Sequence, residues 1–252
     1  RMLVKSYLEK GDPLLIHSMG ALETNNDIPS VLDLPRFSGQ RRLVMAHCGL
    51  IDPGDIHDYI RCGGYAAWLS ALHRPPADIV AEIAASGLRG RGGAGYPTFR
   101  KWVLAQNRDD ARPIVVCNAD EGDPGAYMDR TLLESNPHQI LEGVAVCARA
   151  VGASEAIVYV RTEYPRAVRM VARAITEAER CGLLGENILG TGEALYVSVF
   201  QGSGAFVCGE ETALIESIQG GRGTPRHRPP YPAERGLWDR PTVINNVKTL
   251  SV

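Results

Sequence analysis

A glycine-rich segment at residues 87–97 is the first part of this sequence whose composition suggests binding chemistry. It holds five glycines within nine residues, and the cations Arg89, Arg91, Arg100 and Lys101 lie in it or just after it. Glycines let backbone N–H groups approach a phosphate closely, and the cations add attraction for an anion. The segment is therefore a candidate phosphate-binding loop, and a mobile glycine loop with solvated arginines is the alternative.

The spacing of Gly90, Gly92 and Gly95 matches the G-x-G-x-x-G dinucleotide fingerprint. That fingerprint requires a strand before it and a helix directly after it. Here the apolar spacing predicts a helix over residues 77–86, with Gly87 as its C-cap. We therefore do not expect the ordinary Rossmann placement of this loop.

A second polar segment begins at Asn118, directly after an apolar run that predicts a buried strand over residues 114–117. The Asn118 amide can both donate and accept hydrogen bonds, which suits the edge of a heteroaromatic ring. The carboxylates of Asp120, Glu121 and Asp123 repel one another unless a cation or ligand hydroxyl groups lie among them. Ligand binding, a hard-cation site without EF-hand spacing and a hydrated acidic turn are the alternatives.

A third segment runs from a glycine turn at residues 202–204 into a predicted helix whose first turn holds Glu210 and Glu211. The helix dipole alone favours carboxylates at this place. The sharper interpretation is that one of the two carboxylates accepts a hydrogen bond from a ribose hydroxyl of a nucleotide.

The fourth segment combines a stiff Pro-Pro pair, flanked by Arg228 and Tyr231, with the neighbouring amides of Asn245 and Asn246. An arginine and a tyrosine held on a rigid backbone could stack on an adenine ring or pair with a pyrophosphate. Each segment alone could be ordinary loop chemistry. Four such segments in one chain favour a shared ligand site.

The sequence lacks the motifs of several other enzyme classes. The chain has no Gly-Lys-Ser/Thr phosphate loop, no G-x-S-x-G elbow and no H-E-x-x-H zinc helix. Its six cysteines form no C-x-x-C pair and its six histidines show no metal-ligand spacing, so we expect no metal site in this chain. Scattered cysteines in apolar runs, such as Cys117, are typical of core residues in a reducing cytosol, which predicts a cytoplasmic protein.

Apolar runs and helical periodicities alternate along the middle of the chain. They predict the strands and helices that must position the four segments. Strands are predicted at residues 114–117, 156–160 and 194–200, and helices at 55–73 in two pieces, 77–86, 138–150 and about 168–182. This alternation predicts an α/β fold with a mostly parallel sheet covered by helices. Ligands of such sheets lie beyond the carboxyl ends of the strands.

Charge and hydropathy narrow the class of protein. The 27 Lys and Arg residues nearly balance 29 Asp and Glu residues, which gives no electrostatic reason to expect nucleic acid. No stretch approaches 18 consecutive apolar residues, so we expect no membrane span and only indirect membrane contact. Residues 1–50 are predicted to form a linker or arm, and residues 51–252 the domain. The start at Arg1 suggests a piece of a longer chain.

Taken together, the motifs resemble the flavin-bearing, NADH-oxidising subunit of respiratory complex I and its relatives. Those relatives are the diaphorase subunits of NAD-dependent formate dehydrogenases and of hydrogenases. The matching stretches are residues 87–97 with 101–102, 118–130, 204–217 and 229–250, and the resemblance runs from about residue 43 to residue 252. Residues 48–53 and 123–130 look more like the formate dehydrogenase and hydrogenase branch.

The resemblance implies a Rossmann-like FMN-binding domain in which two sets of residues bind two cofactors. FMN would be held by Gly90, Arg91, Gly92, Gly93, Lys101, Asn118, Asp120, Glu121, Gly209, Glu210, Asn245 and Asn246. NAD(H) would be bound by Tyr96, Asp123, Glu211, Arg228 and Tyr231, and Phe206 is a further cofactor-binding residue. By similarity, Tyr96 would stack on the adenine, and Glu211 near the ribose would disfavour a 2′-phosphate. Glu121 and Asp123 would serve catalysis, with Asp123 near the nicotinamide.

The same resemblance implies hydride transfer between NAD(H) and FMN, followed by single-electron transfer to an iron–sulfur relay. The implied partners are a thioredoxin-like iron–sulfur subunit and a catalytic dehydrogenase or hydrogenase subunit. A ubiquitin-like domain and a [4Fe-4S] domain are expected only after Val252.

This sequence also departs from the family pattern. Phe99 occupies a position that is usually glycine in the family, and Leu104 lies near a position that is usually aromatic. Gln219 and Lys248 occupy positions where glutamate is expected. Phe99 and Leu104 favour the alternative of a catalytically silent, flavin-binding paralogue in such a complex.

Overall fold

The computed structural model describes residues 30–35, 37–106 and 111–252. The chain divides into two compact units, Arg1–Ala46 and His47–Val252. In the first unit, the Oγ of Ser30 caps a short 3₁₀-helix, Val31–Asp33, by accepting a hydrogen bond of 3.2 Å from the Leu32 N–H. Most of the arm predicted at residues 1–50 lies outside the described residues.

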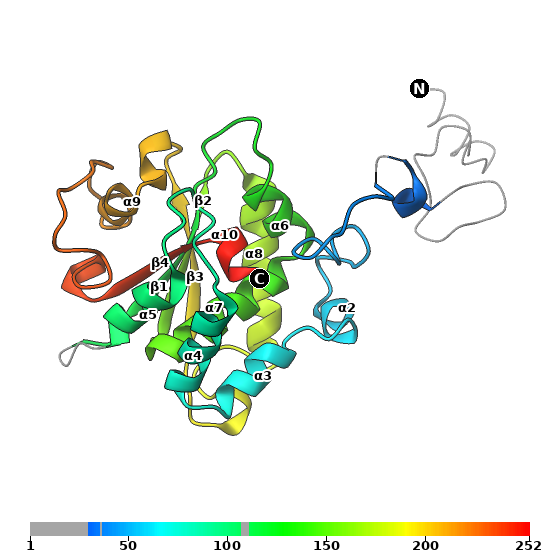
Figure 1. Ribbon diagram of the computed structural model, residues 1–252, viewed down its shortest axis with the longest axis horizontal. Helices are drawn as coiled ribbons and strands as arrows, with labels where there is room; N and C mark the ends of the chain where they lie inside the picture. The colour runs from blue at the N-terminus through cyan, green and yellow to red at the C-terminus, as the bar shows by residue number, and fades with distance from the viewer. Residues whose placement is uncertain (1–29, 36, 107–110) are drawn as a thin grey trace. The chain divides into compact units, whose positions relative to one another are not determined.

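A parallel sheet of four strands forms the centre of the second unit (Figure 1). Its strands are β1 (Ile114–Ala119), β2 (Glu155–Arg161), β3 (Tyr196–Gly202) and β4 (Thr242–Asn246), in the order β3-β2-β1-β4. All three pairings are parallel. The predicted α/β class with a parallel sheet is therefore confirmed.

Helices cover both faces of this sheet. The α-helices of this unit are α2 (Ile56–Arg61), α3 (Ala66–Leu72), α4 (Pro76–Ser86), α5 (Thr98–Gln106), α6 (Asp129–Ser135), α7 (Pro137–Val151), α8 (Pro165–Arg180), α9 (Glu211–Ile218) and α10 (Val247–Leu250), of which α2, α3 and α4 pack mainly on other helices. Helices α7 and α8 pack on β1, β2 and β3, while α9 lies across the strands from them (Figure 1). Among the described residues, no helix combines the length and apolarity that a membrane crossing needs.

Alternate strand residues face the two helical layers, which explains why the strands read as continuous apolar runs. On the α9 side, Ile114, Ile157 and Ile244 form one buried cluster with Leu214 and Ile218 of α9. The intervening residues Val115, Val158 and Val243 are also fully buried or nearly so. Because both faces of β1 and β4 are covered, a ligand can approach these two strands at their ends.

The strand order reverses between β1 and β4. From β1 the chain adds β2 and β3 on one side, and β4 then returns to pair with the other side of β1, with Asn118 opposite Asn246. A crevice beyond the carboxyl ends of the strands at such a switch point is the usual ligand site of an open α/β sheet. The topology therefore brings Asn118 and Asn246, 128 positions apart in sequence, to one place.

Helix α10 packs very closely on α7 through one glycine. A Cβ atom built on Gly143 would lie 1.8 Å from the carbonyl oxygen of Leu250 and 2.7 Å from its carbonyl carbon. No real Cβ contact is that short, so only glycine permits α10 to sit against α7 at this distance. This contact fixes the short helix that directly follows β4.

Four of the six cysteines are buried, including Cys117 in β1 as predicted, whereas Cys62 and Cys181 are exposed. The core interpretation of the cysteines is thus confirmed for the buried four and wrong for the exposed two. Both exposed cysteines stand at helix ends, where the chain leaves the packed layers.

Candidate functional site

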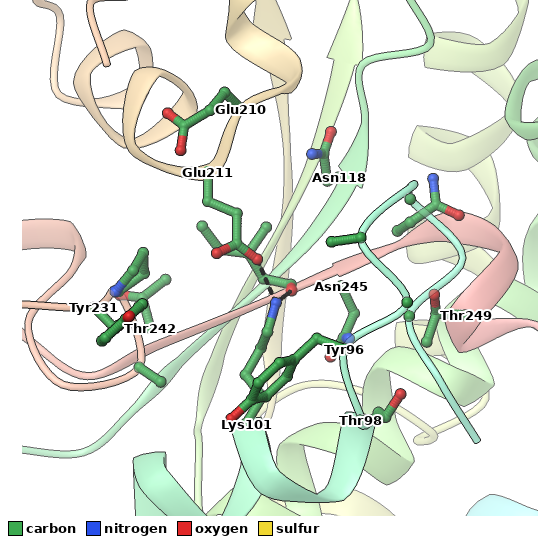
Figure 2. A pocket seen from close by; sticks show the side chains of 18 of the residues that line it. Tyr96, Thr98, Lys101, Asn118, Glu210, Glu211, Tyr231, Thr242, Asn245 and Thr249 are labelled. Atoms are coloured by element: carbon green, nitrogen blue, oxygen red, sulfur yellow. Dashed lines mark hydrogen bonds and ion pairs between the residues drawn. The ribbon is translucent and has the colours of Figure 1, made fainter. Parts of the chain in front are cut away.

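A cavity of about 560 Å³ opens at the carboxyl edge of the sheet, at the switch point between β1 and β4. Five stretches of chain line it: the glycine loop, the first turns of α5, the end of β1, the segment entering α9, and the chain from Arg228 to α10 (Figure 2). The lining residues are Gly90, Gly92, Ala94, Gly95, Tyr96, Thr98, Lys101, Leu104, Asn118, Gly209, Glu210, Glu211, Arg228, Tyr231, Pro232, Ala233, Thr242, Ile244, Asn245, Asn246 and Thr249.

The glycine loop is closed on itself and tied to the end of the domain. The Gly90 N–H donates to the Tyr96 carbonyl at 2.8 Å, and Arg89 pairs with Pro97 across the loop. Gly93 has φ +118°, a conformation that side-chain-bearing residues rarely adopt. Helix α5 follows the loop directly, which the sequence analysis missed, while the preceding element is a helix as predicted.

Gly92 lies directly against the wall that β4 contributes. A Cβ on Gly92 would approach the Cβ of Asn246 to 3.2 Å, and the Arg91 N–H donates to the Thr249 Oγ1 at 2.9 Å. The loop therefore covers Asn246 closely and leaves the cavity as the open space beside it. A larger residue at position 92 would fill part of this space.

Three asparagine amides stand at the strand ends, each held by a neighbour. The Asn118 Nδ2 donates to the Gly209 carbonyl at 3.0 Å, and the Trp102 Nε1 donates to the Asn245 Oδ1 at 3.0 Å. The Asn246 Nδ2 donates to Asp129 at 2.6 Å. The orientation of each amide is thus set before any ligand arrives, which suits recognition of a polar ring edge.

Lys101 is the central cation of the cavity. Its Nζ donates to the Ile244 carbonyl at 2.7 Å and forms an ion pair with Glu211, as the dashed lines in Figure 2 show. Arg228 lies at the mouth, with guanidinium nitrogens 3.6 Å from Glu210 and 3.9 Å from Glu211. Two cations thus balance two carboxylates around the cavity.

The two neighbouring glutamates have different tasks. Glu210 is the N-cap of α9, and its Oε2 accepts hydrogen bonds from the N–H groups of Thr212 at 2.9 Å and Ala213 at 3.0 Å. Capping accounts for this residue type at the start of a helix. Glu211 makes no cap and turns its carboxylate to Lys101 inside the cavity. Of the two, Glu210 stabilises the start of α9 as its N-cap, whereas Glu211 makes no capping hydrogen bond in that helix.

Glu121 and Asp123 do not line the cavity. Glu121 is buried, and its carboxylate accepts hydrogen bonds from the N–H groups of Met128 at 2.5 Å and Arg130 at 2.9 Å. These contacts hold the start of α6. Asp123 is exposed and accepts from the Gly125 N–H at 3.0 Å within its own turn.

Four further predicted residues also lie outside the lining. Arg91 and Gly93 belong to the glycine loop, and Asp120 is buried behind Gly209. Phe206 is 77% exposed on a 3₁₀-helix, Phe206–Gly209, that leads to α9. The remaining twelve predicted residues all line the cavity.

Several lining residues were missed by the sequence analysis. Thr98 begins α5 directly after the glycine loop, and its Oγ1 is buried without a hydrogen-bond partner in the described part of the chain. A threonine directly after a glycine loop is a typical helix start, and this was the available signal. Thr242 and Thr249 also line the cavity, but no motif distinguishes them.

Asp129, the partner of Asn246, carries a shifted pKa. Burial raises the pKa of Asp129 to about 7, the nearby charge of Glu121 adds to the rise, and the Asn246 hydrogen bond opposes it. An unfolded aspartate titrates near 3.9. Between these two pH values the folded state binds more protons than the unfolded state, so this group lowers stability progressively as the pH rises from about 4 to 7.

We therefore expect Asp129→Asn to stabilise the protein at pH 8 but hardly at pH 4.5. Denaturant unfolding at both pH values should show a gain of about 2–4 kcal/mol at pH 8 that shrinks towards the acidic end. The variant Asp78→Asn, which removes an exposed carboxylate from α4, is the control and should not be stabilised at pH 8. A gain of equal size at both pH values would contradict the buried-acid interpretation.

Comparison with known proteins places this geometry in a family. The description "Nuo51 FMN-binding domain" matches residues 83–252. The chain is 48% identical over 212 residues to the NADP-reducing hydrogenase protein HndC of Solidesulfovibrio fructosivorans, covering 84% of this chain and 43% of that protein. It is 48% identical over 196 residues to an NADH-quinone oxidoreductase subunit of Aquifex aeolicus (strain VF5), covering 78% of this chain and 46% of that protein.

A solved structure shows the same fold. A chain of the NAD⁺-reducing [NiFe]-hydrogenase in the H₂-reduced state matches with a TM-score of 0.71 and 36% identity, covering 84% of this chain and 34% of that chain. The present chain thus spans less than half the length of each of these relatives.

Proposed function

The chain belongs to the Nuo51 FMN-binding domain family, and from this premise we propose that it is the NADH:acceptor oxidoreductase, or diaphorase, module of a multi-subunit complex. In this proposal it transfers hydride between NAD(H) and FMN and supplies an iron–sulfur relay with electrons. The single observation that supports it best is the cavity at the β1–β4 switch point, lined by three fixed amides, a glycine loop and Lys101.

The residues present fit a flavin nucleotide. Gly92 keeps open a space that a Cβ would narrow against Asn246, and the buried Thr98 hydroxyl lacks a partner among the described residues. The amides of Asn118 and Asn245 suit a ring with alternating donors and acceptors. When bound, FMN supplies the ability to take up a hydride and release its electrons one at a time, which nicotinamide lacks.

This chain's own residues bind and orient the two cofactors. Lys101, held by Glu211 and the Ile244 carbonyl, presents a fixed positive charge to the flavin. The exposed rings of Tyr96 and Tyr231 offer stacking surfaces at the mouth for the adenine of NAD(H). Arg228, at the same mouth, provides a cation for the pyrophosphate.

A visible spectrum under anaerobic conditions tests the proposal. The purified protein, reconstituted with FMN, should show a flavin band that NADH bleaches and NADPH bleaches far less. A protein that stays colourless and takes up no added FMN would refute the flavin assignment.

One second candidate, a silent structural paralogue, has a specific observation in its favour. Leu104 lines the cavity where the resemblance leads us to expect an aromatic near the adenine. In that case the protein would carry a flavin band that neither dinucleotide bleaches. The same anaerobic titration therefore separates the two candidates.

Glu211→Gln should weaken discrimination against NADPH. The carboxylate of Glu211 repels a 2′-phosphate, but its pairing with Lys101 already offsets part of that charge, so we expect the Kd ratio of NADPH to NADH to fall by about 10-fold rather than more. Equilibrium titration of the FMN-loaded protein measures both constants. Glu216→Gln, on the same helix and paired with Arg226 instead, is the control. An unchanged ratio would remove Glu211 from the ribose site.

Partners and location follow the same proposal. The relatives are named as components of a hydrogenase and of NADH-quinone oxidoreductase, which supports assembly with other subunits. We propose a thioredoxin-like iron–sulfur subunit and a dehydrogenase or hydrogenase subunit as partners in the cytoplasm. A [4Fe-4S] domain would belong to a further C-terminal part of such a protein.

A further inference from the structure

Asp120 and Arg161 form a buried pair just behind the cavity. Asp120 follows β1 directly and Arg161 is the last residue of β2, so both stand at the carboxyl edge of the sheet. The Nη1 of Arg161 lies 3.6 Å from the Oδ1 of Asp120, and the two side chains are 12% and 1% exposed. This distance is short enough for a strong charge interaction but too long for a hydrogen bond.

Both members of the pair have unused hydrogen-bonding capacity. Both carboxylate oxygens of Asp120 and the Nε and Nη1 of Arg161 are buried without a hydrogen-bond partner in the described ranges. Buried polar atoms are almost always paired, so each exception needs an explanation. Asp120 also reaches the cavity wall, because a Cβ on Gly209 would lie only 3.3 Å from its Oδ2.

The guanidinium of Arg161 is fixed by other contacts. Its Nη2 donates to the Gly204 carbonyl at 2.9 Å and to Glu163 at 2.9 Å, and its plane lies near the Tyr164 ring, 6.0 Å from the centroid. These hydrogen bonds involve the Nη2 of the guanidinium and leave its Nη1 available to Asp120. Arg161 therefore links the loops that follow β1 and β3.

The charge state of Asp120 depends on this neighbour. The groups that act on it electrostatically are Arg161 and the Tyr159 hydroxyl from β2 and Glu163 from the following loop. Burial raises the pKa of Asp120 to about 6, Arg161 opposes the rise and Glu163 adds to it. Without the guanidinium, burial and Glu163 would both act to keep the carboxyl protonated near neutral pH.

Resting on the flavin-binding function proposed above, we propose that Arg161 is a positioning residue, which holds Asp120 as an ionised hydrogen-bond acceptor for the flavin at the Gly209 wall of the cavity. The role assigned to Arg161 accounts for the empty acceptor sites of Asp120, since a donor of the ligand would occupy them. It also explains why an arginine stands at the end of β2, although no residue of β2 lines the cavity.

The experiment compares wild type, Arg161→Gln and Arg161→Lys, with Arg166→Gln on α8 as the control for loss of an exposed cation. Carboxyl ¹³C NMR of flavin-free protein follows the Asp120 titration, which is assigned from Asp120→Asn. FMN affinity is measured by fluorescence quenching between pH 5.5 and 8.5. We expect Arg161→Gln to raise the Asp120 midpoint by about two pH units, which leaves about a tenth of the carboxyl ionised at pH 7 and so weakens FMN binding about 10-fold there. Most of the affinity should return at pH 8.5.

In Arg161→Lys, both the Asp120 midpoint and the FMN affinity should lie close to their wild-type values. Thermal melts will identify a variant that fails to fold. An unchanged Asp120 midpoint in Arg161→Gln would overturn the proposal. So would a loss of FMN affinity of equal size at every pH, because that result indicates a purely structural role. If the wild type binds no FMN at any pH, the proposed function itself fails, while the NMR titration still decides whether Arg161 controls Asp120.

Discussion

Lys101→Met should bind FMN about 10- to 100-fold more weakly than the wild type. The Nζ of Lys101 makes two contacts inside the cavity, one with the Ile244 carbonyl and one with the Glu211 carboxylate. These two contacts fix the ammonium in place, and a hydrogen bond from it to the flavin would contribute about 1.5–3 kcal/mol, which corresponds to about 10- to 100-fold in Kd. Removal of the ammonium also leaves Arg228 as the remaining cation of the described lining beside the two carboxylates of Glu210 and Glu211, so a net negative charge would face the flavin.

Fluorescence titration of the flavin-free protein with FMN measures this loss. Arg166→Met removes one exposed cation from α8 and should leave the FMN affinity unchanged. Lys101→Arg keeps the charge but changes its shape, and we expect an intermediate affinity. If Lys101→Met instead kept its FMN affinity and lost only NADH affinity, Lys101 would belong to the dinucleotide part of the site.

Gly143→Ala should lower the free energy of unfolding by about 3 kcal/mol or more. In an open helical position this change is stabilising by up to about 1 kcal/mol, because alanine has the higher helix propensity. Here the new Cβ would meet the Leu250 carbonyl at 1.8 Å, and backbone cannot turn aside as a side chain can. Helix α10 must therefore move off α7, and overpacking of this kind costs stability.

Denaturant unfolding measures the loss, and FMN titration should show a parallel decrease in affinity because α10 carries Thr249. Gly125→Ala is the matched control, since its new Cβ would meet nothing closer than 3.7 Å. That control should stay within about 0.5 kcal/mol of the wild type. A Gly143→Ala protein as stable as the wild type would show that α10 does not sit where the structure has it.

The sequence patterns predicted the parts of the fold in which apolar residues recur regularly. Strands β1 and β2 and helix α7 bury nearly continuous apolar stretches, and the sequence patterns found all three. They also found β3, α4 and α8, which bury fewer of their residues. Helices α5 and α6 were missed, because α5 mixes cations such as Arg100 with its apolar residues and α6 is only seven residues long. Strand β4, five residues long, was not predicted as a strand, and only the amides of Asn245 and Asn246 at its end were singled out.

Pairing of distant segments could not be predicted in the same way. No local pattern says that β4 pairs with β1 rather than with β3, yet this choice creates the switch point and the cavity. Similarly, Glu210 and Glu211 look equivalent in sequence, and only the cap geometry of α9 gives them separate tasks. The burial of Glu121 under α6 depends on the path of a loop, which residue types alone do not specify.

The contact of the glycine loop with Asn246 and Thr249 has a consequence for biosynthesis. Residues about 155 positions apart meet in the wall of one cavity, so this part of the wall is complete only when both segments are in place. Chains emerge from the ribosome with the N-terminal part first, and contacts between distant segments form late. A nascent chain therefore gains its complete cavity only after β4 has left the ribosome and paired with β1, so the cofactor can be inserted only from that point onward.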